Sequence, residues 1–100
     1  VFKELNSVVK TLFREATGEE LDGVPLMRRA FTPSKPVLIL DDLTTESGRN
    51  IQQGYMDLFA GSMAGIRNPQ AHENVMISAE RAAHHLTLAS LLFAKLEERR

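Results

Sequence analysis

The sequence contains no cysteine, no tryptophan and no long hydrophobic run among its 100 residues. Without cysteine, it forms neither a disulfide nor a thiolate metal site. Without an apolar stretch of about 20 residues, a membrane-spanning helix is not expected. A signal-peptide pattern is missing as well. We therefore expect a cytoplasmic protein that has no membrane partner.

The sequence also lacks an excess of charge of either sign. Its formal net charge is −1, from 12 lysines and arginines against 13 aspartates and glutamates. This balance excludes a general polyanion-binding arm, so any contact with nucleic acid must come from a local basic patch. The candidate residues for such a patch are Arg28, Arg29, Lys35, Arg49 and Arg67. For Arg28 and Arg29 we favour a simpler interpretation, the solvated face of a short helix.

The hydrophobic fraction of 43% and the charged fraction of 25% are those of an ordinary globular domain. We expect one domain over residues 1–100. A monomer of this size buries only about two-thirds or less of its unfolded surface, so dimerisation would help it. Because the sequence begins at Val1 rather than at methionine, we expect this domain to be the C-terminal part of a longer chain.

The first half of the sequence predicts two helices and an irregular segment. Apolar residues recur at helical spacing over 2–17, and Gly18 is a natural helix stop. A short helix is expected over 24–31, where Pro25 suits the first turn. Two prolines and a polar tail then break helical order. Around 32–46 we expect an irregular loop or a short hairpin that contains the apolar residues 37–40.

The second half predicts two long helices. The first, over 46–67, carries one apolar stripe, made of Ile51, Tyr55, Leu58, Phe59, Met63 and Ile66. Its small residues, among them Gly54, Gly61 and Gly65, indicate close approach by another element. Pro69 is expected to end this helix and to push Asn68 away from helical angles.

The last helix is expected over 78–98, with Ser78 as its N-cap. Its broad apolar face comprises Ala79, Ala82, Ala83, Leu86, Ser90, Phe93 and the nearby leucines. The sequence as a whole therefore predicts a mainly α protein, a small helical bundle.

Chemistry is concentrated at the end of the helix over 46–67, in the sequence IRNPQAH. Arg67 offers a fixed charge and a planar fork of donors that matches phosphate oxygens. His72 titrates near neutral pH and transfers protons. Together they suit cleavage of an RNA phosphodiester without a metal, with Asn68 holding the histidine or a phosphate oxygen. One histidine per chain supplies both proton transfers if two copies face each other in a homodimer.

From the spacing alone, a structural interpretation is more common than a catalytic one. An arginine at a helix C-terminus interacts well with the dipole, and Asn-Pro is a frequent turn opener. His84 and His85 are adjacent on a helix and point about 100° apart, so we expect one half-buried and one solvated ring. No sequence pattern for a metal, a cofactor or a phosphate loop is present.

Three segments resemble the HEPN superfamily and, more narrowly, the Ymh-type family of bacterial and archaeal proteins. They are LMRRAF near position 28, MDLFAGSMAGIRNPQAH and AERAAHHLTLASLL, and they cover most of the chain. The resemblance implies a dimeric helical bundle and a metal-independent endoribonuclease. It also implies that Arg67 stabilises phosphate, that His72 is the acid/base residue and that Asn68 is the polar helper.

The resemblance further implies RNA as the substrate and a role as a defence or toxin effector, with an additional domain or a regulatory protein as a possible partner. Two alternatives stay open. One is a non-catalytic helical module that dimerises, binds RNA or assembles a larger protein. The other is a nucleotide-binding or small-molecule-binding bundle, which no phosphate-loop or cofactor motif favours.

Overall fold

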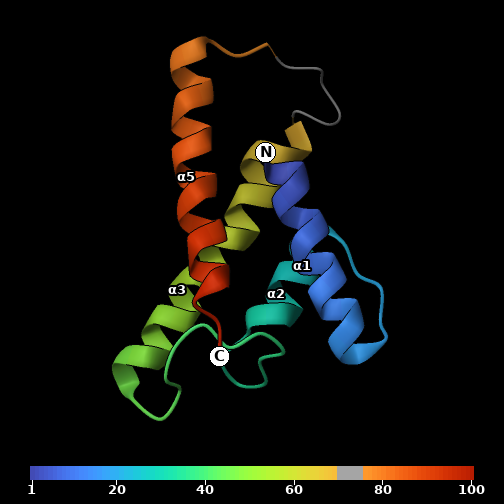
Figure 1. Cartoon of the computed structure of the whole chain (residues 1–100), viewed down its shortest axis with the longest axis vertical. Helices are drawn as coiled ribbons and strands as arrows, with labels where there is room; N and C mark the ends of the chain where they lie inside the picture. The colour runs from blue at the N-terminus through green and yellow to red at the C-terminus, as the bar shows by residue number, and fades with distance from the viewer. Residues whose placement is uncertain (70–75) are drawn as a thin grey trace.

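Four α-helices and one π-helical turn form a small bundle in the computed structural model (Figure 1), which describes residues 1–69 and 76–100. The elements in chain order are α1 (Phe2–Thr17), α2 (Gly23–Phe31), α3 (Glu46–Ser62), η1 (Met63–Arg67) and α5 (Ala79–Glu97). No strand occurs in the described part of the chain. The prediction of a mainly α bundle is therefore confirmed.

Local capping chemistry sets the predicted helix ends. Gly18 ends α1 in the left-handed conformation, at φ 77°, and its N–H donates to the Arg14 carbonyl oxygen at 2.8 Å. The Ser78 hydroxyl accepts a hydrogen bond of 3.1 Å from the Arg81 N–H at the start of α5. Both boundaries fall where the sequence places them.

The hydrophobic core lies between α1, α2, α3 and the C-terminal half of α5. Stacked rings of Phe31 and Phe59, with centroids 4.5 Å apart, join α2 to α3 at its centre. The other large side chains that are fully buried include Phe2, Leu5, Val9, Phe13, Leu26, Met27, Met63 and Leu92. These helices therefore present fixed faces to the outside, and the candidate site is built from them.

The buried face of α3 is rotated from the expected one. Phe59 and Met63 are buried as predicted, but Ile51 and Leu58 are 36% and 42% exposed. The apolar stripe therefore does not coincide with the buried face. The inner face instead includes Gln52, a polar residue that is completely buried because its amide has hydrogen-bond partners there. Hydrophobicity alone does not locate the buried face of α3, because it gives no reason to place a glutamine inside.

Gln52 organises the irregular segment between α2 and α3. Its Oε1 accepts a hydrogen bond from the Leu40 N–H at 2.8 Å, and its Nε2 donates to the carbonyl oxygens of Phe31 and Leu38 at 2.9 and 3.0 Å. The segment therefore packs as an irregular loop, one of the two forms expected around 32–46. Two of its own residues, Leu38 and Leu40, are buried.

The fully buried residues of α5 all lie in its C-terminal half. Ala89, Leu92 and Leu96 are buried there, whereas the broad apolar face expected from the sequence is mostly exposed. Its exposed members are Ala79, Ala82, Ala83, Leu86 and Ser90. The apolar face of this helix is therefore buried only in part. The N-terminal end of α5 extends beyond the other helices (Figure 1), and residues 79–84 are exposed there.

The C-terminal end of α5 is fixed by polar contacts to the irregular loop and to α3. The Arg100 N–H donates to the Ile39 carbonyl oxygen at 2.8 Å. The Lys95 ammonium lies 3.7 Å from the Asp41 carboxylate and 5.3 Å from the centroid of the Tyr55 ring.

Across residues 1–69 and 76–100, none of the helices has the length and hydropathy needed to cross a membrane.

Gly48 and Gly54 provide a matched test of packing within α3. An added Cβ at Gly48 would lie 1.7 Å from the backbone oxygen of Asp42, whereas one at Gly54 would meet nothing within 4 Å. We expect Gly48→Ala to lower the free energy of unfolding by about 3 kcal/mol or more, because backbone must move. Gly54→Ala should raise it by up to about 1 kcal/mol, through helix propensity.

Urea denaturation followed by circular dichroism measures both alanine variants under the same conditions. Equal losses of stability in the two variants would contradict the described packing of α3. A loss at Gly54 alone would show instead that another chain packs against this exposed face.

Candidate functional site

The candidate site begins at η1, the wide turn that ends with Arg67. The Asn68 N–H donates to the Met63 carbonyl oxygen, five residues earlier, which is the π-helical pattern. Asn68 itself has helical angles, φ −63° and ψ −46°, and helical structure continues through Pro69. The expectation that Pro69 displaces Asn68 from the helical region was wrong. The π turn rearranges the backbone that would otherwise oppose the proline ring.

The Arg67 side chain is held against the start of α2. Its Nη2 donates to Asp22 Oδ2 at 3.0 Å, in an ion pair that links residues 45 positions apart in the sequence. The arginine side chain is 22% exposed and the aspartate 50%. The guanidinium is therefore oriented by the fold while part of it still reaches solvent.

A buried asparagine in α1 holds Asp22 from the other side. Asn6, only 5% exposed, donates through Nδ2 to Asp22 Oδ1 at 2.5 Å. Its Oδ1 accepts a hydrogen bond of 3.0 Å from the Gly23 N–H. Asn6 thus satisfies its buried amide and ties α1 to the start of α2. Through Asp22, the same network reaches Arg67 in η1.

Gly23 makes room for the guanidinium. Its φ is 63°, in the left-handed region, where a side chain is strained. A Cβ built there would also lie 3.1 Å from Arg67 Nη1. The backbone of Gly23 and the side chain of Arg67 therefore pack closely, and any larger residue would push the arginine aside.

The surroundings of Asp22 favour its charged form. The hydrogen bond from Asn6 lowers the pKa of the carboxyl from its ordinary value of 3.8, against the opposing effect of burial. The hydrogen bond and charge of Arg67 lower this pKa further, and the charge of Lys10 adds to the effect. Because the pKa is lowered, these interactions stabilise the fold above pH 3.8, and the stabilisation is lost as the pH falls through the lowered value.

The three predicted site residues have different outcomes. Arg67 lies in the network described above, and partly buried Asn68 follows it directly. His72 falls outside the described residues. The predicted division between the other two histidines is confirmed, since His84 is exposed and His85 is half-buried, with its ring edge-on to Phe2 at 6.1 Å.

The other basic candidates have partners of their own. Arg28 Nη1 donates to Asp57 Oδ1 at 2.7 Å across the exposed faces of α2 and α3. Arg49 Nη1 donates to the Leu43 carbonyl oxygen at 3.0 Å. The solvated helix face expected for Arg28 is confirmed. These residues brace neighbouring segments and do not extend the surroundings of Arg67.

Arg29 and Lys35 line a groove at the other end of α2. The groove has a volume of about 540 Å³ and also includes Glu19, whose carboxylate lies 3.2 Å from Arg29 Nη2. Arg67 contacts the N-terminal end of α2, so the fold does not bring these two cations into its site. The groove is mixed in charge rather than basic.

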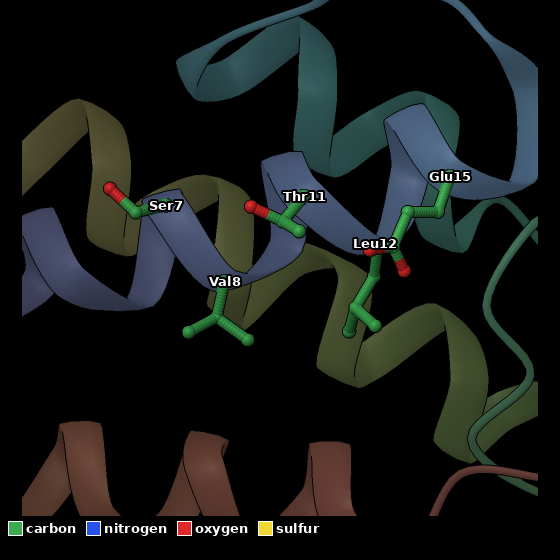
Figure 2. A pocket seen from close by; sticks show the side chains of 5 residues that line it. All are labelled: Ser7, Val8, Thr11, Leu12 and Glu15. Carbon is green, nitrogen blue, oxygen red and sulfur yellow. The ribbon is translucent and has the colours of Figure 1, made fainter.

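A second groove, of about 340 Å³, runs along α1 and is lined by Ser7, Val8, Thr11, Leu12 and Glu15. The side chains of Val8 and Leu12 point from α1 toward the side on which α5 lies (Figure 2). The groove is mainly apolar and does not include Arg67. It is therefore separate from the candidate site.

The chemistry available at the candidate site is that of an oriented cation. A guanidinium fixed at one nitrogen retains further N–H donors for the oxygens of a phosphate. No group of three or more metal-binding side chains occurs within the described portion of the chain. The arrangement is therefore suited to holding an anionic group beside Asn68.

Sequence analysis did not identify Asp22, Gly23 or Asn6 as part of this site. Asp-Gly is a strong turn signal, and the asparagine interrupts the apolar stripe of α1, at 5% exposure among Phe2, Leu5 and Val9. These two sequence features mark a turn at Asp22–Gly23 and a polar residue on the buried face of α1. They did not reveal that Arg67, far along the chain, pairs with them.

Comparison with known proteins relates nearly the whole chain to one family. The family described as "Protein of unknown function (Hypoth_ymh)" has a model that matches residues 3–96. No curated protein and no solved structure matches the chain.

Proposed function

The chain belongs to the Ymh family. From the site around Arg67 we propose that it is an endoribonuclease of the HEPN type that cleaves RNA without a metal. The observation that carries the proposal is the placement of Arg67. Its guanidinium is oriented by Asp22 at 3.0 Å and is partly exposed. Asn68 follows Arg67 directly in the sequence. A fixed planar cation at a surface matches the geometry of phosphodiester oxygens.

The proposed reaction uses the 2′-hydroxyl of the RNA as the nucleophile. This hydroxyl attacks the adjacent phosphorus, and the 5′-oxygen of the next nucleotide leaves, so the products carry a 2′,3′-cyclic phosphate and a 5′-hydroxyl. Arg67 stabilises the negative charge that develops on the phosphate oxygens. His72 transfers protons, and Asn68 orients the histidine or a phosphate oxygen.

Two proton transfers per cleavage favour a homodimer. The attacking hydroxyl loses a proton and the leaving oxygen gains one, whereas each chain supplies a single histidine in the motif. Two copies of the motif in one cleft provide both groups. We therefore propose that RNA binds between two copies of this domain.

The proposed cellular role is that of a defence or toxin effector. An RNase of this kind must be restrained until it is needed. A further domain or a regulatory protein would supply the restraint, and no cofactor enters the proposed reaction.

A non-catalytic interaction module is the second candidate function. Large apolar side chains are exposed on two helices, with Leu58 at 42% on α3 and Leu86 and Leu91 at 56% and 48% on α5. Such surfaces favour assembly with another protein. This module would bind RNA or a partner without cleaving it.

The test of the proposed function is made on the substrate. Wild-type protein is incubated in EDTA with a mixed pool of RNAs, and one cleavage site is mapped. An oligonucleotide spanning that site is then made with a single 2′-deoxy nucleotide immediately 5′ of the scissile phosphate. We expect the all-RNA oligonucleotide to yield a 2′,3′-cyclic phosphate and the substituted one to resist cleavage, because it lacks the nucleophile.

Cleavage of both oligonucleotides at the same rate would rule out attack by the 2′-hydroxyl. Cleavage that occurs without EDTA and is lost in its presence would rule out the metal-independent reaction. Binding of the pool without any cleavage would favour the interaction module.

A further inference from the structure

We propose that Asp22, held by Asn6, is a positioning residue that fixes the guanidinium of Arg67 for phosphate binding. This inference rests on the proposed function, because it names the group that prepares the same site. It draws on residues of α1 and of the turn before α2 that no sequence motif connects with Arg67.

The two carboxylate oxygens of Asp22 have separate partners. Oδ2 accepts a hydrogen bond from Arg67 Nη2 at 3.0 Å, and Oδ1 accepts one from Asn6 Nδ2 at 2.5 Å. The carboxylate cannot rotate toward one partner without losing the other. Its position is therefore fixed by the bundle rather than by the arginine alone.

Asp22 occupies a helix N-cap position without serving as a cap. An aspartate before the first turn of a helix ordinarily accepts a hydrogen bond from an N–H of that turn. In α2 the Asp22 side chain makes no such bond. The carboxylate instead contacts Asn6 in α1 and Arg67 in η1. Its position is therefore set by these two contacts and not by capping of α2.

The contact with Asp22 occupies one of the side-chain donors of Arg67. Arginine has five N–H donors, and within residues 1–69 and 76–100 its one hydrogen-bond acceptor is Asp22. Nη1 lies against Gly23, which offers no side chain in that direction. A phosphate that approaches the exposed edge therefore meets a guanidinium that has already lost its rotational freedom, and less entropy is lost on binding.

The same ion pair could instead act as a latch, in which Asp22 masks Arg67 until RNA displaces it. The support behind Asp22 argues against this alternative. Asn6 is 5% exposed and is itself held by the Gly23 N–H at 3.0 Å. If the half-exposed carboxylate swung away from Arg67 into solvent, the buried Asn6 amide would lose its hydrogen bond to Asp22 as well. Positioning and masking make opposite predictions when the charge of Asp22 is removed.

The test compares Asp22→Asn with Asp57→Asn. Asp57 pairs with Arg28 at 2.7 Å on an exposed face, so its variant breaks a similar arginine–aspartate contact away from the site. The side-chain ¹⁵N–¹H signals of Arg67 are recorded by NMR, and inorganic phosphate and a mixed-sequence 2′-O-methyl RNA, which cannot be cleaved, are titrated into each protein.

In wild type and in Asp57→Asn we expect slow exchange of the Arg67 Nε proton and a shift of its signal on addition of either probe. In Asp22→Asn the exchange should be faster and the affinity for both probes about tenfold lower, the size expected for loss of one charge-assisted hydrogen bond. If the RNA alone shifts the signal, an RNA affinity that falls in Asp22→Asn supports the proposal and an unchanged one overturns it.

Exchange and affinity that stay unchanged in Asp22→Asn would overturn the proposal. Tighter binding in that variant would also overturn it, and would identify Asp22 as a latch. These readouts do not depend on catalysis. A wild-type protein that binds the probes but cuts no RNA would refute the proposed ribonuclease activity and leave the role of Asp22 decided by the NMR result.

Discussion

Gln52→Ala is expected to lower the free energy of unfolding by about 4 kcal/mol, a large part of the stability of a domain of this size. The substitution leaves the Leu40 N–H and the carbonyl oxygens of Phe31 and Leu38 without their partner in a buried place. It also opens a cavity where a completely buried side chain stood. Urea denaturation monitored by circular dichroism measures the change.

The adjacent glutamine is the matched control. Gln53 is exposed, and its amide lies 3.3 Å from Asp57 on the surface of α3. Gln53→Ala should change the free energy of unfolding by no more than about 0.5 kcal/mol. If the two alanine variants unfolded at the same urea concentration, Gln52 would not hold the 32–45 loop as described.

Arg67→Ala is expected to reduce the rate of RNA cleavage by about 10²- to 10³-fold, the usual effect of removing one group that stabilises transition-state charge. Arg67→Lys should recover only part of the rate, because an ammonium lacks the planar fork. The fold should survive both changes, since the ion pair with Asp22 is partly exposed and contributes on the order of 1 kcal/mol. Single-turnover cleavage of a labelled RNA gives the rates.

Arg28→Ala is the control for loss of charge. Arg28 is an exposed arginine paired with an aspartate, as Arg67 is, but it lies on the outer face of α2. Its removal should change the cleavage rate by less than about twofold, as expected for a surface residue outside the site. Equal losses in the Arg28 and Arg67 variants would show that total positive charge matters rather than the position of Arg67.

Helix ends could be predicted from the sequence because capping is a local property. Gly18 and Ser78 fix the ends of α1 and α5 through hydrogen bonds to residues three or four positions away. Which face of each long helix is buried could not be predicted from local signals. It depends on which partner the rest of the chain supplies, and α5 is fully buried only at positions in its C-terminal half.

Buried polar side chains explain much of why the inner faces of α1 and α3 could not be predicted from hydrophobicity. Asn6 and Gln52 each lie on the inner face of a helix, where an analysis of hydrophobicity expects apolar residues. Each is accommodated because distant backbone or side-chain groups complete its hydrogen bonds. Their partners are 12 to 21 residues away along the chain, so only the fold reveals why these polar residues are inside.

The candidate site was predictable in one part and not in another. Arg67 and Asn68 could be named from the motif at the end of a glycine-rich helix. The pairing of Arg67 with Asp22 could not, because many acidic residues are available in the sequence and the correct one lies 45 positions away. The π turn was missed for a related reason, since Pro69 by itself predicts a break in the helix rather than a wider turn.

Exposed apolar residues in the described chain agree with the expectation that this domain associates with a second copy. Ile51 and Leu58 on α3 and Leu86 on α5 are all exposed. An added Cβ at Gly54, Gly61 or Gly65 would meet nothing within 4 Å, so no element of the described chain uses the close approach that these glycines permit. The homodimer itself remains a prediction, and analytical ultracentrifugation would measure it.

The most direct measurement compares wild type with Arg67→Ala/His72→Ala on a mixed pool of RNAs in EDTA, with circular dichroism to confirm that both proteins are folded. We predict that wild type cuts the RNA and leaves 2′,3′-cyclic phosphate ends, and that the folded double variant does not cut. Cleavage at the wild-type rate by the double variant would contradict the assignment of IRNPQAH as the active site.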